Sequence, residues 1–501
     1  MFTSSFTLNP AFTIAPVNRR TFGSFVEHMG RCVYSGIYEP THPTADADGF
    51  RQDVLDLTRE MGVTMVRYPG GNFVSGYRWE DGVGPVEDRP VRRDLAWHSI
   101  ETNEVGIGEF ARWARKADVE IMYALNLGTR GIQEALDVQE YLNHPGGTYL
   151  SDLRAAHGSP EPYSITLFCL GNEMDGPWQT GHKTSHEYGR LAAETARCLR
   201  SGQADLELVA CGSSESSMPT FGAWESEVLE LAYDTVDYIS AHAYYEMFDD
   251  DLGSFLACAV DMDQFIDQIV ATADSVAARL KSRKRIQISF DEWNVWYRER
   301  FHAAGTPEWQ VAPRLVEDSY NVADAVVVGN LLISLLRHSD RVTAACQAQL
   351  VNMIAPIRTE PDGPAWRQTI FHPFALTSRL ARGSVLRLQV DSPTYRTAQY
   401  GDVPLIDAVA THDGDSGDVT VFVVNRHRTE TAGLTVSLQE FGNLEVREAW
   451  TVTDSDLYAI NTAQAPDRVV PQPVGSAKVI AGTLAAELAP VSWTAIRLAT
   501  A

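Results

Sequence analysis

Short apolar segments alternate with longer amphipathic segments between about residues 20 and 375 of this 501-residue chain. The amphipathic segments include residues 187–201 and 265–284, in which apolar positions recur at helical spacing. Eight strand–helix units in one stretch predict parallel pairing and a (β/α)8 TIM barrel over residues 18–374. The predicted strands are residues 21–27, 64–70, 120–126, 165–172, 207–213, 237–244, 286–293 and 342–350.

A doubly wound open sheet is the alternative to a barrel. Such a sheet is usually shorter and often carries a glycine-rich phosphate turn. This chain has no GxGxxG or Walker pattern. The barrel is therefore the favoured prediction.

The pattern changes after about residue 375, where apolar and polar residues alternate with a period of two. Segments 418–441, 444–454 and 482–500 show this alternation and are separated by Gly, Asp and Asn. This pattern is typical of an antiparallel β-sandwich, here of the jelly-roll kind. The N-terminal residues 1–17 alternate in the same way. We therefore expect residues 1–17 and 375–501 to form one β-sandwich domain.

Composition restricts the class of protein and its partners. Hydrophobic residues make up 44% and charged residues 21%, as in soluble globular proteins. The net charge of −25 makes nucleic acid or an anionic membrane surface an unfavourable partner. No apolar run approaches the roughly 20 residues of a membrane span, and the N-terminus lacks the pattern of a signal peptide. Six scattered cysteines without a CxxC motif favour a reduced, cytoplasmic setting.

Polar side chains follow nearly every predicted barrel strand. In a (β/α)8 barrel the carboxyl ends of the strands meet at one cleft, so these side chains should lie together. They are Glu27, Arg67, Asn72, Asn126, Asn172, Glu173, Glu215, His242, Tyr244, Glu292 and Gln349, and the nearby tryptophans are Trp79, Trp97, Trp178, Trp293 and Trp296. Aromatic faces beside hydrogen-bonding groups suit the apolar faces and hydroxyls of a sugar ring.

Two of the carboxylates predict glycoside hydrolysis. Glu173 follows the fourth strand and Glu292 the seventh, each after an apolar run and before aromatic residues. One carboxyl group can protonate the leaving oxygen while the other attacks the anomeric carbon or activates water. We assign Glu173 as the acid/base and Glu292 as the nucleophile. Arg67, His242 and Tyr244 would favour the ionised form of Glu292.

Other interpretations of single residues stay open at this point. Arg67 could brace the barrel through buried carboxylates, and any one tryptophan could serve packing alone. Asp291 should point to the face of its strand opposite Glu292 and be structural. His182 and His186 could hold a metal, but no third ligand supports this. The acidic run 246–253 lacks the order of an EF-hand and suits a solvated loop.

Six motifs together resemble the glycoside hydrolase family 51 α-L-arabinofuranosidases. They are "FVEHMGRCVYSGIYEP", "VRYPGGNFVSGYRWEDGVGP", "LGNEMDGPWQTGHKTSHEYGRLA", "SAHAYY", "SFDEWNVWY" and "AQLVNMIAP…GPAWRQTIFHPF". The resemblance extends over the barrel and the sandwich, and it implies the same acid/base and nucleophile. It also implies an arabinofuranose pocket made by Glu27, Arg67, Asn72, Asn172, His242, Tyr244 and Gln349, with Trp97 and Trp296 near its mouth. A homohexamer is implied by the family alone.

The expected activity is that of an exo-acting retaining α-L-arabinofuranosidase on arabino-oligosaccharides, arabinan and arabinoxylan fragments, with no metal or organic cofactor. The alternatives are a β-xylosidase or endoglucanase on the same scaffold, and a sugar-binding barrel without catalysis. The loop at residues 245–255 looks less typical of the family and leaves the preferred linkage open.

Overall fold

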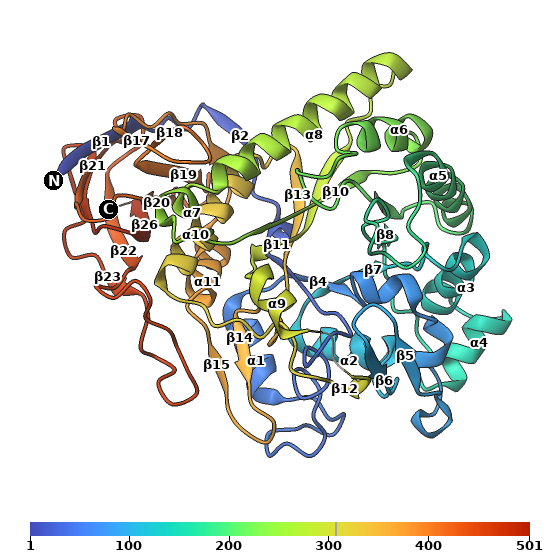
Figure 1. The fold of residues 1–501 in the computed structure, drawn as a ribbon. Helices are drawn as coiled ribbons and strands as arrows, with labels where there is room; N and C mark the ends of the chain where they lie inside the picture. The colour runs from blue at the N-terminus through green and yellow to red at the C-terminus, as the bar shows by residue number, and fades with distance from the viewer. Residues whose placement is uncertain (306–307, 501) are drawn as a thin grey trace.

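Eight parallel strands form a closed barrel in the computed structural model, which describes residues 1–305 and 308–500 (Figure 1). Around the barrel they run β3 (Gly23–Phe25), β4 (Met65–Tyr68), β7 (Glu120–Ala124), β8 (Leu167–Leu170), β9 (Glu207–Ala210), β10 (Tyr238–Tyr245), β11 (Gln287–Val295) and β13 (Val342–Gln347). Each lies within or overlaps one of the eight strands expected from the sequence, in the same order. The predicted barrel is confirmed.

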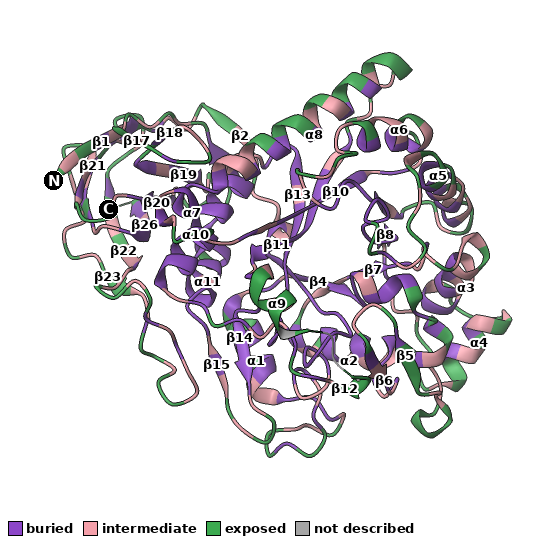
Figure 2. Ribbon diagram, in the orientation of Figure 1, coloured by how far each residue is buried: buried purple, intermediate pink, exposed green. Residues whose placement is uncertain are grey.

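Helices cover the outside of the barrel and leave its strands buried (Figure 2). The helices of the described residues, not all of which cover the barrel, are α1 (Gln52–Met61), α2 (Ile107–Ala117), α3 (Ile132–Asn143), α4 (Tyr149–Ala156), α5 (Ser185–Gly202), α6 (Ala223–Ala232), α7 (Leu252–Leu256), α8 (Ala259–Leu280), α9 (Arg298–Ala304), α10 (Val322–Arg337) and α11 (Phe371–Leu380). Both helices expected from the sequence are present, as α5 and α8. Phe265, Ile269 and Val276 are buried on α8, whereas Leu280 is exposed at its final turn. Within the described residues no helix combines the length and apolarity needed to cross a bilayer.

A β-sandwich lies beside the barrel and contains both chain ends (Figure 1). One sheet has the order β1 (Phe2–Thr7), β21 (Ala432–Ser437), β25 (Thr483–Leu488) and β24 (Lys478–Ile480). The other has the order β2 (Thr13–Pro16), β16 (Ser384–Leu386), β19 (Ile406–His412), β20 (Val419–Asn425), β26 (Ser492–Thr500), β22 (Leu444–Val452) and β23 (Gln472–Pro473). The predicted pairing of the N-terminal strand with the C-terminal region is confirmed.

One pair in the sandwich departs from the antiparallel prediction. Strand β1 runs parallel to β21, with Phe2 opposite Ala432 and Thr7 opposite Ser437. Hairpins enforce antiparallel pairing only between strands that a short turn connects. Since β1 comes from the other end of the chain, no turn fixes its direction.

Helix α10 connects the barrel to the sandwich. It is buried along nearly its whole length and packs against β19, β20 and β26 as well as β11 and β13. The Arg337 guanidinium at its end contacts the carboxylates of Asp263 and Asp407, which lie on α8 and β19. Helix α11 runs across residue 374, so the expected division of the chain at that residue stays a prediction.

Candidate active site

A cavity opens at the carboxyl ends of the barrel strands, where the sequence predicts the site. Its volume is about 50 Å³. It is lined by Phe25, Glu27, Met29, Gly71, Asn72, Trp97, Glu173, Tyr244, Glu292, Trp296, Val316, Gln349 and Ile354. Both carboxylates assigned from the sequence therefore face one cavity. Six other predicted residues line it as well, namely Glu27, Asn72, Tyr244, Gln349, Trp97 and Trp296, whereas Arg67, Asn172 and His242 are not part of the lining.

Glu292 is held by two strong hydrogen-bond donors. The Arg67 guanidinium on β4 donates to Oε1 at 2.7 Å, and the Tyr244 hydroxyl on β10 donates to Oε2 at 2.7 Å. A second nitrogen of Arg67 donates to Asn172 Oδ1 at 2.7 Å. Burial opposes the charge of Arg67, but the carboxylates of Asp291 and Glu292 hold its pKa well above the usual range. A negative charge on Glu292 is thus compensated inside the barrel.

Glu173 follows β8 at a sharp turn, where its backbone adopts φ 44°, a value uncommon outside glycine. One carboxylate oxygen, Oε1, lies 2.9 Å from Nδ1 of His242, and the other, Oε2, accepts a hydrogen bond of 2.8 Å from the Trp178 indole N–H. Burial raises the pKa of Glu173, the hydrogen bond from His242 opposes this, and the nearby charge of Glu292 adds to the increase. The raised pKa suits a group that must carry a proton before the reaction.

The prediction that Asp291 points away from the site is wrong. Strand β11 contains a β-bulge. Ser289 pairs with Ser240 of β10 and Glu292 pairs with His242, so β11 has one more residue than β10 between the two pairs. The extra residue turns Asp291 inward as well, and its Oδ1 lies 2.8 Å from Nε2 of His242. Burial alone would lower the pKa of His242, but the charge of Glu292 and the bonds to Asp291 and Glu173 raise it to about 10. His242 therefore lies between two carboxylates that favour its protonated form.

Glu27 lies at the end of β3 and accepts three hydrogen bonds. Its Oε1 accepts from the Phe73 backbone N–H at 2.9 Å and from the Trp97 indole at 3.0 Å, and its Oε2 accepts from Gln349 at 3.0 Å. Burial, helped by the charge of Glu292, raises the pKa of Glu27 to about 8 although the backbone bond lowers it. This side chain can therefore offer a proton as well as oxygen atoms to a bound hydroxyl.

Asn72 connects the second and fourth strand ends. Its Oδ1 accepts hydrogen bonds from Asn172, at 3.2 Å, and from the Gln179 amide. Sequence reasoning missed Gln179, and it named Trp178 only as a neighbouring aromatic residue. The signal available was the run "PWQ" directly after the Glu173 loop, since a loop that passes the cavity can place consecutive side chains on it.

Three other predicted features lie outside the cavity lining. Asn126 donates to a backbone carbonyl and to Thr129. Glu215 accepts a hydrogen bond of 2.8 Å from Arg298. In the acidic run, Asp251 accepts from a backbone N–H and caps α7. These contacts give local structural roles to groups that the sequence placed near the cleft.

The tryptophans divide between the cavity and the core. Trp296 packs edge-on against Tyr244, with ring centres 5.0 Å apart, and Trp97 lines the same cavity. Trp79 and Trp293 are 7% and 0% exposed and belong to the hydrophobic core. The first two line the cavity, and the last two serve packing.

Glu173, His242 and Glu292 approach one another closely. One ligand atom from each lies within 4.8 Å of the others, a spacing that could also hold a metal ion. Both ring nitrogens of His242 already face carboxylate oxygens, however: Nδ1 lies 2.9 Å from Glu173 and Nε2 lies 2.8 Å from Asp291. The histidine pair noted in the sequence is separated from this group, since His186 contacts Glu227 on α6 at 3.1 Å. The arrangement favours proton transfer over metal chemistry.

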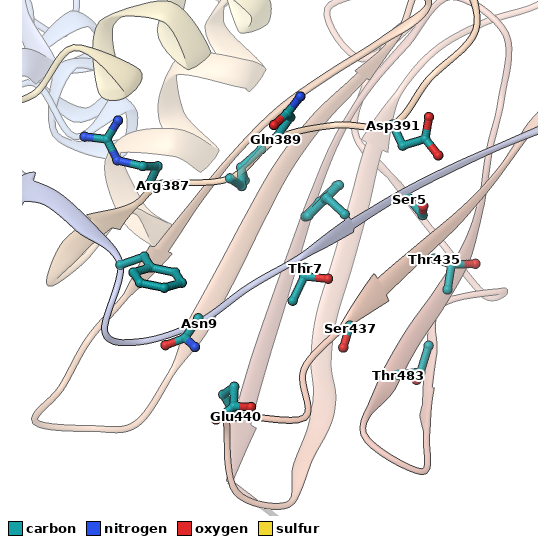
Figure 3. Close-up of a pocket in the computed structure, with 13 residues that line it drawn as sticks. Ser5, Thr7, Asn9, Arg387, Gln389, Asp391, Thr435, Ser437, Glu440 and Thr483 are labelled. Carbon is teal, nitrogen blue, oxygen red and sulfur yellow. The ribbon is translucent and has the colours of Figure 1, made fainter.

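A much larger hollow of about 940 Å³ lies on the sandwich (Figure 3), and its lining includes neither Glu173 nor Glu292. Its labelled side chains are Ser5, Thr7, Asn9, Arg387, Gln389, Asp391, Thr435, Ser437, Glu440 and Thr483. Size alone would favour this hollow as the active site. The smaller cavity is the better candidate because it contains three buried carboxylates, Glu27, Glu173 and Glu292, with different surroundings.

Comparisons with known proteins agree with this geometry. The model of the Alpha-L-arabinofuranosidase 1 domain matches residues 57–255, and that of the Alpha-L-arabinofuranosidase C-terminal domain matches residues 291–492. An intracellular exo-α-(1→5)-L-arabinofuranosidase of Streptomyces lividans is 61% identical over 502 residues, covering 100% of this chain and 76% of its own. An exo-α-(1→6)-L-arabinofuranosidase of Bifidobacterium longum is 54% identical, covering 97% and 95% of the two chains.

A solved structure extends the likeness to three dimensions. The family 51 α-L-arabinofuranosidase AbfB of Bifidobacterium longum superimposes with a TM-score of 0.96 at 49% identity, covering 99% of both chains. An α-L-arabinofuranosidase of Thermotoga maritima, solved with arabinose, gives a TM-score of 0.87 at 31% identity, covering 99% of both chains. With the matched domains and the barrel–sandwich fold, these likenesses show that the chain belongs to the glycoside hydrolase family 51 α-L-arabinofuranosidases.

Proposed function

We propose that the chain is an exo-acting retaining enzyme that removes terminal α-L-arabinofuranosyl units from arabino-oligosaccharides, arabinan and arabinoxylan fragments. The observation that carries this proposal is the approach of carboxylate oxygens of Glu173 and Glu292 to within 4.8 Å in one cavity. Retaining glycosidases hold their two carboxyl groups about 5–5.5 Å apart, whereas inverting enzymes leave roughly 6.5–9.5 Å for a water molecule. The short separation supports direct attack on the sugar.

The reaction follows from the different surroundings of the two carboxylates. Glu292, ionised beside Arg67 and Tyr244, attacks the anomeric carbon while Glu173 gives its proton to the leaving oxygen. Glu173 then takes a proton from water, and the water oxygen replaces Glu292 at the anomeric carbon. Two displacements restore the original configuration. A protonated His242 stabilises the negative charge of Glu292 before attack and that of Glu173 after proton transfer.

The remaining polar side chains are proposed to bind one arabinofuranosyl unit. Glu27, Asn72, Asn172 and Gln349 present carbonyl oxygens, amides and a carboxyl group at the carboxyl ends of the strands. Trp97 and Trp296, which line the cavity, are proposed to form apolar walls for the sugar ring. The small volume of the cavity supports removal of terminal units over cleavage within a chain.

We also propose a cytoplasmic location and a hexameric assembly. The location is supported by the word intracellular in the names of relatives from Streptomyces lividans and Halalkalibacterium halodurans. The assembly rests on family membership, and light scattering would give about six times the chain mass of 55.3 kDa. A particle of monomer mass at micromolar concentration would contradict it.

The test compares hydrolysis of aryl α-L-arabinofuranoside, aryl β-D-xyloside and a β-glucan. We expect the first to be preferred and the product observed first by proton NMR to have the α configuration. Preference for a β-linked substrate would favour a xylosidase or endoglucanase. Binding without turnover would indicate a non-catalytic barrel. A product of β configuration would indicate an inverting mechanism. Because relatives are named for (1→5) and for (1→6) linkages, both oligosaccharides belong in the panel.

A further inference from the structure

The indole of Trp178 is the most exposed group in direct contact with either catalytic carboxylate. Trp178 lies in the loop between β8 and α5, and half of its surface, 50%, is open to solvent. Its N–H nevertheless points to Oε2 of Glu173 at 2.8 Å instead of to water. A large exposed aromatic residue held in this way needs a structural cause.

The cause is a glycine two positions earlier. A Cβ atom at Gly176 would lie 2.5 Å from Cε2 and 2.7 Å from Cζ2 of the Trp178 ring, closer than carbon atoms can approach. The ring therefore lies directly across the backbone of Gly176. The N–H of Gly176 donates to the Glu173 carbonyl at 2.9 Å, and the Gln179 N–H donates to the Gly176 carbonyl at 3.0 Å. The loop is thus folded to carry the indole back to Glu173.

The two oxygens of Glu173 consequently have different surroundings. Oε1 contacts His242, which is buried, so the leaving group cannot approach from that side. Oε2 lies beside the half-exposed indole, on the side of the carboxyl group that is nearer to solvent. Proton transfer to the leaving oxygen must therefore occur next to the Trp178 N–H.

We propose that Trp178 is a positioning residue for the acid/base, and that its N–H holds Oε2 of Glu173 in the ionised state that follows proton transfer. This inference rests on the proposed function, because it takes Glu173 as the acid/base. When Glu173 gives its proton to the leaving oxygen, the carboxylate that forms accepts a stronger hydrogen bond from the indole. The same bond keeps the carboxylate aimed at the water molecule that reacts next.

Loss of this hydrogen bond should shift the pH profile in one direction. A hydrogen bond to the charged form of a carboxylate favours that form, so the indole lowers the pKa of Glu173 against the increase caused by burial. Loss of the N–H should raise that pKa further. The alkaline limb of kcat/KM, which reports the protonated acid, should then move upward by about 0.5–1 pH unit.

The experiment uses the full-length enzyme and an arabino-oligosaccharide, whose poor leaving group requires the acid. Two variants remove the N–H: Trp178→Phe, and a site-specific replacement by 3-benzothienylalanine, which keeps the bicyclic shape with sulfur in place of nitrogen. The matched control is Trp450→Phe on β22, since the Trp450 indole also donates to a carboxylate, Glu448, at 2.9 Å but lies in the sandwich.

Both variants at residue 178 should move the alkaline limb upward, leave the acid limb unchanged and lower kcat more than they change KM, while the control keeps the parent profile. The inference is overturned if the benzothienyl variant keeps the alkaline limb within about 0.2 unit of the parent, even where activity falls at every pH. In that case the parent still cleaves arabino-oligosaccharides, and the proposed function stands. If the parent itself fails to cleave them, both the proposed function and this inference are wrong.

Discussion

Replacement of Glu173 by alanine separates the two halves of the proposed reaction. The change removes the carboxyl group that lies beside His242 and Trp178, and it leaves Glu292 with both of its hydrogen bonds. Substrates that need a proton on the leaving oxygen should lose about 10²- to 10⁴-fold in kcat/KM, which corresponds to roughly 3–5 kcal/mol of the barrier. An activated aryl arabinofuranoside should form the covalent intermediate at close to the parent rate.

The second half of the reaction should then limit turnover, because no base activates water. Azide needs no base, and the space vacated by the carboxyl group lies within 4.8 Å of Glu292. We expect azide to restore turnover of the aryl substrate and to give α-L-arabinofuranosyl azide, identified by NMR. Steady-state rates with and without azide measure the effect on both substrate types.

Glu173→Gln is the matched control. The amide cannot give up a proton, but it fills the volume of the carboxyl group, so activity should fall and azide should not restore it. The reasoning is refuted if azide fails to accelerate the alanine variant, if it accelerates the glutamine variant equally, or if aryl and oligosaccharide substrates are impaired to the same extent. A β-configured azide product would show that the nucleophile is misassigned.

Two further predictions concern charge and packing. Asp291→Asn removes one carboxylate from His242 and should lower its pKa from about 10 by about one to two units. Since the pKa of His242 is raised in the folded state, protonation of His242 stabilises the fold fully below about pH 6.5, and this stabilisation is lost as pH rises toward 10. The variant should lose it at a lower pH. Titration of ¹³C-labelled histidine rings measures both proteins, and an unchanged His242 would contradict the structure. Gly329→Ala should destabilise the protein by about 1–3 kcal/mol in urea, because its Cβ would lie 2.2 Å from the Trp493 ring, whereas Gly442→Ala, with no described atom within 4 Å, should be neutral.

The sequence contains enough information for the eight strands and for most of the cavity. Each barrel strand is a short apolar run, and the polar residue that ends it must lie at the common rim, because parallel strands in a barrel share one direction. This reasoning needs only local patterns. It brought Glu173 and Glu292 to one cavity although 119 positions separate them along the chain.

The same reasoning failed where a strand departs from regular alternation of its side chains. The face of Asp291 was derived from strict alternation, but a bulge adds one residue to β11 and turns both neighbouring acids inward. Nothing in the letters "SFDEW" distinguishes a regular strand from a bulged one. The Trp178 hydrogen bond was likewise missed, because it depends on how a loop folds over Gly176 and not on spacing.

The parallel pair formed by β1 and β21 also affects how the chain is made. Phe2 finds its partner only when Ala432 has been synthesised, at the far end of the chain. At about 5–20 residues per second, the emerging N-terminus waits roughly 20–90 s on the ribosome with one edge unpaired. The barrel can close during that interval, whereas the sandwich is the last part to assemble. A tag fused before Met1 would be attached to this late-pairing strand, so it should slow folding of the sandwich more than a tag placed after Ala501.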